Sequence, residues 1–260
     1  MKETLNVALI QADLVWEKAE VNRQNLRTVF NALPKKTDLI VLPEMFPTGF
    51  SMHPEKIAET MNGETIKWLK EQADHFQTAI CGSMIIKDHG KFYNRFLMVF
   101  EDGAISTYNK RHTFTLSGED KIYERGYEKV IVDLKGWKIC PMVCYDLRFP
   151  VWSRNVEDYD LLIYVANWPV ERIDAWDALL KARAIENMSY CVGVNRIGED
   201  GNGYKFNGHS AAFNGLGNRL AEFEEDEAGY KQVEMNRDHL TEIRESLMFL
   251  QDRDEFNLEV

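Results

Sequence analysis

The sequence predicts a layered α/β protein with one large mixed β-sheet or two packed sheets. Two observations predict it: strands alternate with helices in the first half of the chain, and hairpins dominate the middle and the end. Alternation is typical of parallel pairing and hairpins give antiparallel pairing, so both kinds are expected in the sheets. The 260 residues show no repeats, low-complexity segments or linkers, which favours one domain over residues 1–260.

The first half of the chain alternates buried strands with amphipathic helices. LNVALIQADL (5–14) is predominantly apolar, as expected for a buried strand, and TDLIVLPE (37–44) is a second such run. A helix is predicted between them at 17–33, because its apolar residues recur at helical spacing: Val21, Leu26, Val29, Phe30 and Leu33. A second helix at 63–76 and a third strand at 78–86 follow.

The second half of the chain is predicted to be rich in hairpins. Four strands form two hairpins, closed by the turns EDG and KG: 91–100 with 103–110, and 129–134 with 137–145. A further strand at 159–167 precedes a long helix at 174–190. Three strands complete the set: 191–198, 208–215 and 219–225.

Composition and charge limit the class of function. The chain is 45% hydrophobic and 28% charged, which is typical of a soluble globular protein. The net charge is −11 and the basic residues form no stripe, which argues against a nucleic-acid partner. No run approaches the about 18 apolar residues of a membrane span, and the N-terminal segment lacks the pattern of a signal peptide. We therefore expect a cytoplasmic protein with no membrane partner.

The four cysteines (Cys81, Cys140, Cys144 and Cys191) are scattered, mostly within apolar runs, which indicates a reducing compartment. Cys140 and Cys144 would lie about 13 Å apart in an extended strand, too far for a disulfide. No second Cys or His pair completes a zinc pattern, so a metal site is not expected. Cys140 is interpreted as a small core residue.

Two predicted strands end in a charged residue with catalytic chemistry. Glu44 follows the apolar run LIVLP, and burial disfavours the charged form of a carboxylate, which suits a general base. The alternative is an edge carboxylate that caps a loop. Lys110 ends the strand ISTYNK, where it could hold an oxyanion as a fixed positive charge. The alternative is a solvated lysine that protects a sheet edge.

A third strand end carries a cysteine. Cys144 stands where WKICPMVC gives way to YDLRFP, so a rigid strand would present it to a pocket. The backbone N–H of Tyr145 would point at the same pocket. Because His112 lies two residues after Lys110, a Cys–His pair is a rival to a cysteine activated by glutamate.

The order and the flanks of these residues resemble the nitrilase superfamily of carbon–nitrogen hydrolases. The motifs LPEMF, NKRH and VCYDLRFP each follow a predicted strand, and VALIQADL, YVANWP and KARAIENMSY extend the resemblance over nearly the whole chain. The resemblance implies a four-layer α-β-β-α sandwich that associates into a homodimer, largely through the helix containing residues 175–188. It also implies catalysis without a metal or organic cofactor.

The same resemblance implies a role for each candidate residue: Glu44 as general base, Lys110 as oxyanion lysine, Cys144 as nucleophile that forms a thioester, and the Tyr145 N–H as a second oxyanion donor. Members also carry a second glutamate seven residues before a glycine. Glu119 stands seven residues before Gly126 and is expected to position Lys110 and the substrate amide. The chain departs from the family at Arg125, where members usually have proline.

The stretches CYDLRFPVWSRN and YVANWP look most like the omega-amidase branch, whose members deamidate 2-oxoglutaramate and 2-oxosuccinamate. Such a small-molecule amide carries a far carboxylate that a cation must meet. Four arginines are available: Arg111, Arg148, Arg154 and Arg172. Arg148 is either the substrate anchor or a structural ion-pair partner, and Trp168 is either a pocket wall or a core residue.

Other functions remain open from the sequence. A nitrilase, an amidase for deaminated glutathione and an N-carbamoyl amine hydrolase share the same catalytic residues. A catalytically silent scaffold that binds partners through a dimer surface is a hypothesis from a different class.

Overall fold

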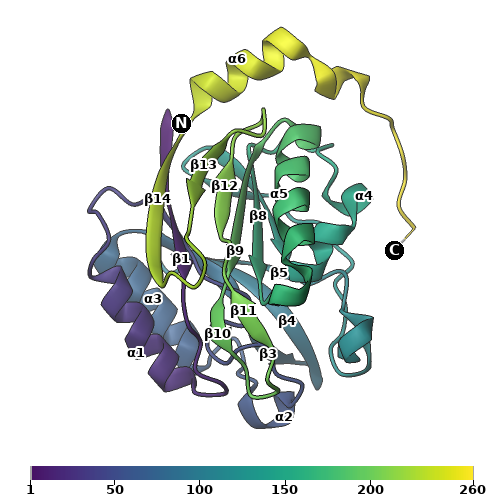
Figure 1. The fold of residues 1–260 in the computed structure, drawn as a ribbon. Coiled ribbons are helices and arrows are strands. Elements are labelled where there is room, and N and C mark those ends of the chain that lie inside the picture. The colour runs from purple at the N-terminus through teal and green to yellow at the C-terminus, as the bar shows by residue number, and fades with distance from the viewer. Residues whose placement is uncertain (1, 260) are drawn as a thin grey trace.

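Residues 2–259 are described in the computed structural model, and they form two β-sheets that pack face to face (Figure 1). Each of these sheets has six strands. Helices cover the outer face of each sheet, so the layers follow the order α-β-β-α. The two packed mixed sheets confirm the fold class that the sequence predicts.

The first sheet combines parallel strands at its centre with antiparallel strands at its edges. In spatial order its strands are β14 (Gly229–Asn236), β1 (Thr4–Gln11), β2 (Leu39–Val41), β3 (Ala79–Asp88), β4 (Lys91–Val99) and β5 (Ile105–Asn109). The pairs β1–β2 and β2–β3 are parallel, and the other pairs are antiparallel. The short crossovers through helices and the EDG hairpin account for this mixture.

The second sheet has the same plan. In spatial order its strands are β13 (Arg219–Glu222), β12 (Ala211–Phe213), β9 (Tyr190–Asn195), β8 (Leu161–Ala166), β7 (Trp137–Val143) and β6 (Val132–Leu134). The pairs β7–β8 and β8–β9 are parallel. A separate hairpin of β10 (Ile197–Glu199) and β11 (Lys205–Asn207) stands outside both sheets. The carboxyl ends of central parallel strands are the usual location of a site in such folds.

Three long helices form the outer layers. Helices α1 (Ala19–Phe30) and α3 (Glu64–Phe76) contact each other, and α3 packs on the first sheet. Helix α5 (Ile173–Asn187) packs on β9 and β12 of the second sheet (Figure 1). The other helices lie at the periphery: α2 (Pro54–Ile57), α4 (Pro150–Ser153) and α6 (Arg237–Leu247).

Strand β1 shows how the sequence builds two cores. Its side chains alternate between the two faces of the sheet. Leu5, Val7 and Leu9 belong to the large core between the sheets. Ala8 and Ile10 belong to the smaller core under α1 and α3. A strand that is buried on both faces therefore reads as a nearly continuous apolar run, as the sequence indicated.

The structure corrects the expected elements near the C-terminus. The expected strand 191–198 is interrupted at Arg196, between β9 and β10, and the strands expected at 208–215 and 219–225 are shorter. The sequence reading assigned no element to β14 or α6. In β14 only Val233 and Met235 are buried, so its apolar alternation is weak.

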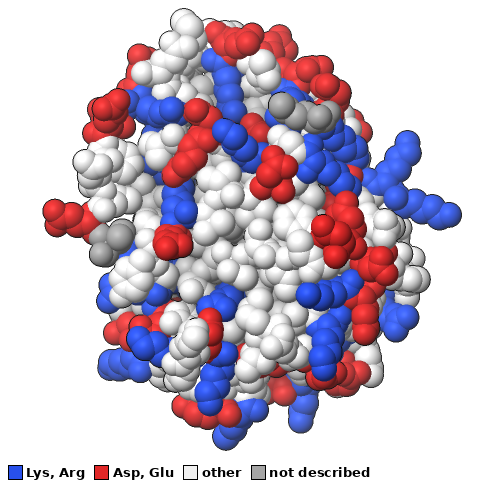
Figure 2. Space-filling model, turned by 180° about the vertical axis from the view of Figure 1, so that it is seen from behind, with Lys and Arg blue, Asp and Glu red and all other residues white. Residues whose placement is uncertain are grey.

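Charges are mixed on the face of the molecule that Figure 2 shows. Lys and Arg are interspersed there with Asp and Glu around a largely uncharged centre, and they do not gather into one patch. Within residues 2–259, no helix is both long enough and apolar enough to cross a membrane.

Candidate active site

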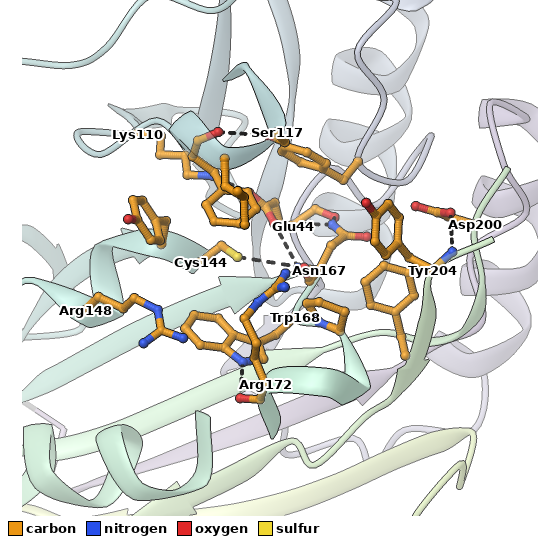
Figure 3. A pocket seen from close by; sticks show the side chains of 16 residues that line it. Glu44, Lys110, Ser117, Cys144, Arg148, Asn167, Trp168, Arg172, Asp200 and Tyr204 are labelled. Carbon is orange, nitrogen blue, oxygen red and sulfur yellow. Dashed lines mark hydrogen bonds and ion pairs between the residues drawn. The ribbon is translucent and has the colours of Figure 1, made fainter. Parts of the chain in front are cut away.

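Residues that follow four strands of the two sheets line one pocket (Figure 3). Glu44 and Lys110 come from the first sheet, where they follow β2 and β5. Cys144 and Asn167 come from the second sheet, where they follow β7 and β8. The packing of the two sheets therefore places three of the four predicted catalytic side chains in the lining of a single cavity, and Glu119 is not part of that lining.

The ammonium of Lys110 lies between two carboxylates. Its Nζ donates to Oε1 of Glu44 at 2.9 Å and to Oε2 of Glu119 at 2.9 Å. The Lys110 side chain is 1% exposed, so the alternative of a solvated edge lysine is wrong. Burial opposes its charge, yet the carboxylates of Glu119 and Glu44 raise the pKa of the Lys110 ammonium. The lysine therefore stays protonated as a fixed positive charge.

Glu44 is fully buried and both of its carboxylate oxygens accept hydrogen bonds. Oε1 accepts from Lys110 and from Nδ2 of Asn94, the latter at 2.8 Å. Oε2 accepts from the backbone N–H of Asn167 at 2.8 Å. Glu44 follows β2, which lies between β1 and β3 inside the sheet, so the alternative of an edge carboxylate is wrong.

Glu119 is also fully buried. The contacts of Gly126 explain why a glycine stands seven residues after it. Burial raises the pKa of Glu119, although the adjacent Lys110 ammonium opposes this. Gly126 donates its N–H to the carbonyl of Lys110 at 2.8 Å. A Cβ at Gly126 would lie 2.1 Å from the carbonyl oxygen of Asn109. The glycine thus allows the segment carrying Glu119 to close on the strand end that carries Lys110.

Cys144 adopts a left-handed backbone conformation with φ of 45°. It begins a short 3-10 turn (Cys144–Arg148), so β7 ends one residue earlier, at Val143. Such a conformation costs about 1–3 kcal/mol in a non-glycine residue and is typical of functional sites. Burial and the Glu44 carboxylate raise the pKa of the Cys144 thiol. The thiol is therefore protonated at neutral pH and needs a base when it attacks.

Cys140 differs from Cys144 in its surroundings. It is fully buried in the core between the sheets, and burial raises the pKa of its thiol to about 12. This confirms the interpretation of Cys140 as a core residue. All four cysteines are free thiols.

His112 lies in a network outside the pocket lining. Its Nδ1 lies 2.8 Å from Oδ1 of Asp146, and its backbone N–H donates to the same oxygen at 2.9 Å. Its ring stacks on Phe149 with the centroids 3.7 Å apart. The geometry thus favours a glutamate-activated cysteine over the Cys–His pair.

Two of the four candidate arginines line the pocket, and two do not. Arg148 and Arg172 line it, and within residues 2–259 neither guanidinium has a carboxylate within 4.0 Å. Arg148 therefore has no ion-pair partner within residues 2–259, and the alternative of a structural ion pair is wrong. Arg111 instead donates to the carbonyl of Gly126. Arg154 donates to the carbonyl of Glu186, and neither of these two lines the pocket.

Aromatic side chains surround the two pocket arginines. Arg148 lies over the ring of Trp168 at 4.9 Å, and Arg172 lies over Phe114 at 5.3 Å. Trp168 is a pocket wall and also belongs to the core, because it packs on Trp176 with the ring centroids 5.5 Å apart. Tyr145, whose backbone N–H is the predicted second oxyanion donor, also lines the pocket.

The sequence reading missed several residues of the site. Asn94 donates to both Glu44 and Glu119, but it lies in the middle of β4. An asparagine next to an arginine, inside the otherwise largely apolar run KFYNRFLMVF, is the pattern that could have indicated it. The hairpin of β10 and β11 supplies Tyr204 and Phe206 to the pocket wall, although the sequence predicted only its first two residues as part of a strand and assigned no element to residues 199–207.

The chain has two packed mixed sheets between helices, with this cavity at the ends of their strands. This arrangement defines a hydrolase fold of the nitrilase type. The chain belongs to the carbon–nitrogen hydrolase family, whose sequence model matches residues 6–245.

Relatives with assigned activities are similar over nearly the full length. The chain is 43% identical over 257 residues to an omega-amidase of Yersinia enterocolitica, with 98% of this chain and 99% of the relative covered. It is 30% identical over 251 residues to a 2-oxoglutaramate amidase of Bacillus subtilis, with 95% and 96% covered. A solved CN-hydrolase superfamily protein of Xanthomonas campestris, with an arsenic adduct in its active site, superposes with a TM-score of 0.96. That protein is 38% identical, and 99% of this chain and 100% of the other are covered.

Proposed function

We propose that this chain is an omega-amidase that releases ammonia from 2-oxoglutaramate and 2-oxosuccinamate through a thioester on Cys144. The observation that carries the proposal is the pair of arginines, Arg148 and Arg172, in the same pocket as that thiol. The omega-amidase and 2-oxoglutaramate amidase relatives support it.

The lining of the pocket suits a short chain with an amide at one end and a carboxylate at the other. A guanidinium binds a carboxylate through two parallel hydrogen bonds. Trp168, Phe114 and Phe206 offer apolar surface for the methylene groups between the two ends. With the amide at Cys144, the charged end of the substrate lies toward the arginines.

The acylation step follows from the groups around Cys144. Glu44 accepts the thiol proton while the sulfur forms a bond to the amide carbon. The negative charge moves to the amide oxygen, where the Lys110 ammonium and the Tyr145 N–H stabilise it. The carbon–nitrogen bond then breaks, and Glu44 returns its proton to the leaving nitrogen, which departs as ammonia. A thioester remains on Cys144.

The deacylation step uses the same base. Glu44 accepts a proton from a water molecule as the water oxygen attacks the thioester carbon. The carbon–sulfur bond then breaks, and the sulfur of Cys144 recovers a proton from Glu44. The hydrolysed substrate is released as the free acid. During both steps Glu119 keeps Lys110 in place, because the Lys110 ammonium donates hydrogen bonds to the Glu119 carboxylate.

Ammonia release from a panel of substrates tests the proposal. The panel contains 2-oxoglutaramate, 2-oxosuccinamate, glutamine, an N-carbamoyl amine, deaminated glutathione and an aliphatic nitrile. We expect kcat/KM for the two 2-oxo amides to exceed that for glutamine by about tenfold or more, since glutamine brings an ammonium beside two arginines. Strong activity on another member of the panel, with none on the 2-oxo amides, would refute the proposed substrate.

We further propose that residues 1–260 act as one catalytic domain and pair into a homodimer through the outer face of α5. Ile185 on that face is 45% exposed, which supports the proposal. Sedimentation velocity should give a mass of twice the chain, and Ile185→Asp should shift it toward one chain.

A further inference from the structure

Asn167, which follows β8 of the second sheet, forms hydrogen bonds to Glu44, which follows β2 of the first sheet. Its backbone N–H donates to Oε2 of Glu44 at 2.8 Å. Its side-chain Nδ2 donates to the main-chain carbonyl of Glu44 at 2.6 Å and to Oε2 at 3.4 Å. The residue is 8% exposed, so water competes little for these bonds.

The side-chain amide of Asn167 bonds to Glu44 alone among residues 2–259. Its Oδ1 is buried and has no hydrogen-bond partner in that part of the chain. The orientation of the amide is fixed, because a rotated amide would bring two oxygens together at the Glu44 carbonyl. Leaving a buried carbonyl unpaired is unfavourable. Here it occurs on a side chain whose hydrogen bonds within residues 2–259 go only to the candidate base.

The two oxygens of Glu44 are thereby held from opposite sheets. Lys110 and Asn94 hold Oε1, and Asn167 holds Oε2. The carbonyl oxygen of Asn167 also lies 3.9 Å from Sγ of Cys144. Figure 3 shows the contacts of Asn167 with both Glu44 and Cys144.

We infer that Asn167 is a positioning residue that holds the Glu44 carboxylate in place beside Cys144 during both steps. The inference rests on the proposed role of Glu44 as the base, but it does not depend on which amide is the substrate. The charged or titratable groups that face Glu44 are Lys110, Glu119 and Cys144. Asn167 differs from these three groups because it is uncharged and donates hydrogen bonds to Glu44.

Three variants test the inference. Asn167→Ala removes the side-chain donor, although the backbone N–H remains. Asn167→Asp places a second carboxylate beside Glu44. Asn155→Ala is the matched control, because Asn155 is likewise buried and its amide donates to main-chain carbonyls, but it does not touch Glu44. Each variant is assayed by thermal unfolding, by kcat and KM on 2-oxoglutaramate, and by the pH dependence of Cys144 alkylation with iodoacetamide.

We expect Asn167→Ala to lower kcat about 100-fold, since a misplaced catalytic group has an effect of that size. KM should stay within about threefold, because the lost contact is made to the base and not to the substrate. Alkylation at pH 7 should slow about tenfold. In Asn167→Asp the acid limb of the alkylation profile should move up by about one pH unit, because adjacent carboxylates resist joint ionisation. Asn155→Ala should lose thermal stability and keep wild-type rates.

Two results would overturn the inference. If Asn167→Ala lost only stability, as the Asn155 control does, with kcat and alkylation unchanged, the role of Asn167 would be structural. A rise in KM at constant kcat would instead assign the side chain to substrate binding. If the wild-type protein does not hydrolyse 2-oxoglutaramate, the proposed substrate fails, while the alkylation measurements still decide the role of Asn167.

Discussion

Nδ1 of His112 lies 2.8 Å from Oδ1 of Asp146, a fully buried carboxylate two residues after Cys144. The other oxygen of Asp146 accepts from the backbone N–H of Val143 at 2.9 Å and from the hydroxyl of Tyr108 at 2.8 Å. Asp146 therefore ties the turn that begins at Cys144 to the strand end that carries Lys110. The histidine serves this network and not the thiol.

His112→Ala should therefore leave the reactivity of Cys144 nearly intact. The variant loses one hydrogen bond to a charged group and the stack on Phe149, which together should cost about 1–3 kcal/mol in the free energy of unfolding. Urea unfolding measures this loss. Alkylation of Cys144 by iodoacetamide at pH 7 should stay within about threefold of wild type, whereas a Cys–His mechanism requires its near abolition. His75→Ala, an exposed histidine on α3, is the control and should change neither quantity.

Glu44→Gln should lower kcat by about 10²–10⁴-fold, since the amide keeps the shape of the carboxylate but cannot accept a proton. Burial raises the pKa of the Cys144 thiol, so without its base the thiolate fraction should grow about tenfold per pH unit between pH 7 and 9. The alkylation rate of the variant should follow this slope and lie below the wild-type rate at pH 7. Glu124→Gln is the matched control, because Glu124 pairs with Lys91 at the surface. Equal alkylation of Glu44→Gln and wild type at pH 7 would assign the base elsewhere.

Cys144→Ala should abolish turnover, whereas Cys140→Ala should preserve it. The second variant removes a buried sulfur from the core and should cost about 1–2 kcal/mol in the free energy of unfolding. Acid-quenched intact mass spectrometry of the wild-type protein with substrate should show an acyl adduct that maps to Cys144. Turnover that survives in Cys144→Ala, or an adduct on another residue, would remove Cys144 from the mechanism.

Arg148→Met and Arg172→Met should each lower kcat/KM for 2-oxoglutaramate by about 10- to 100-fold. A hydrogen bond to a charged group contributes about 1.5–3 kcal/mol, and about 1.4 kcal/mol corresponds to a factor of ten. Propionamide has no carboxylate, so hydrolysis of this neutral amide should change far less. Arg154→Met removes an arginine of the same segment that lies outside the pocket lining, and it should retain wild-type specificity. An equal loss on both amides would argue against carboxylate binding by these arginines.

The order of the strand ends made much of the site predictable. Glu44, Lys110 and Cys144 each follow an apolar run, and the spacing from Glu119 to Gly126 is a local pattern in the chain. The sequence could not rank Arg148 above Arg154, because both flank the same turn and only their directions differ. Asn94 escaped notice since a strand interior gives no indication of which face a single polar residue joins.

The sequence by itself determined the α/β layers, the mixed pairing and the order of the catalytic candidates, because strand ends and apolar periodicity are properties of neighbouring residues. Only the tertiary structure decided that two sheets meet so that Asn167 holds Glu44 across their interface. It also decided that His112 bonds to Asp146 and that Arg148 faces the pocket. The physical reason is that these contacts depend on how two sheets pack, and their partners lie tens of residues apart in the chain, where local spacing carries no information.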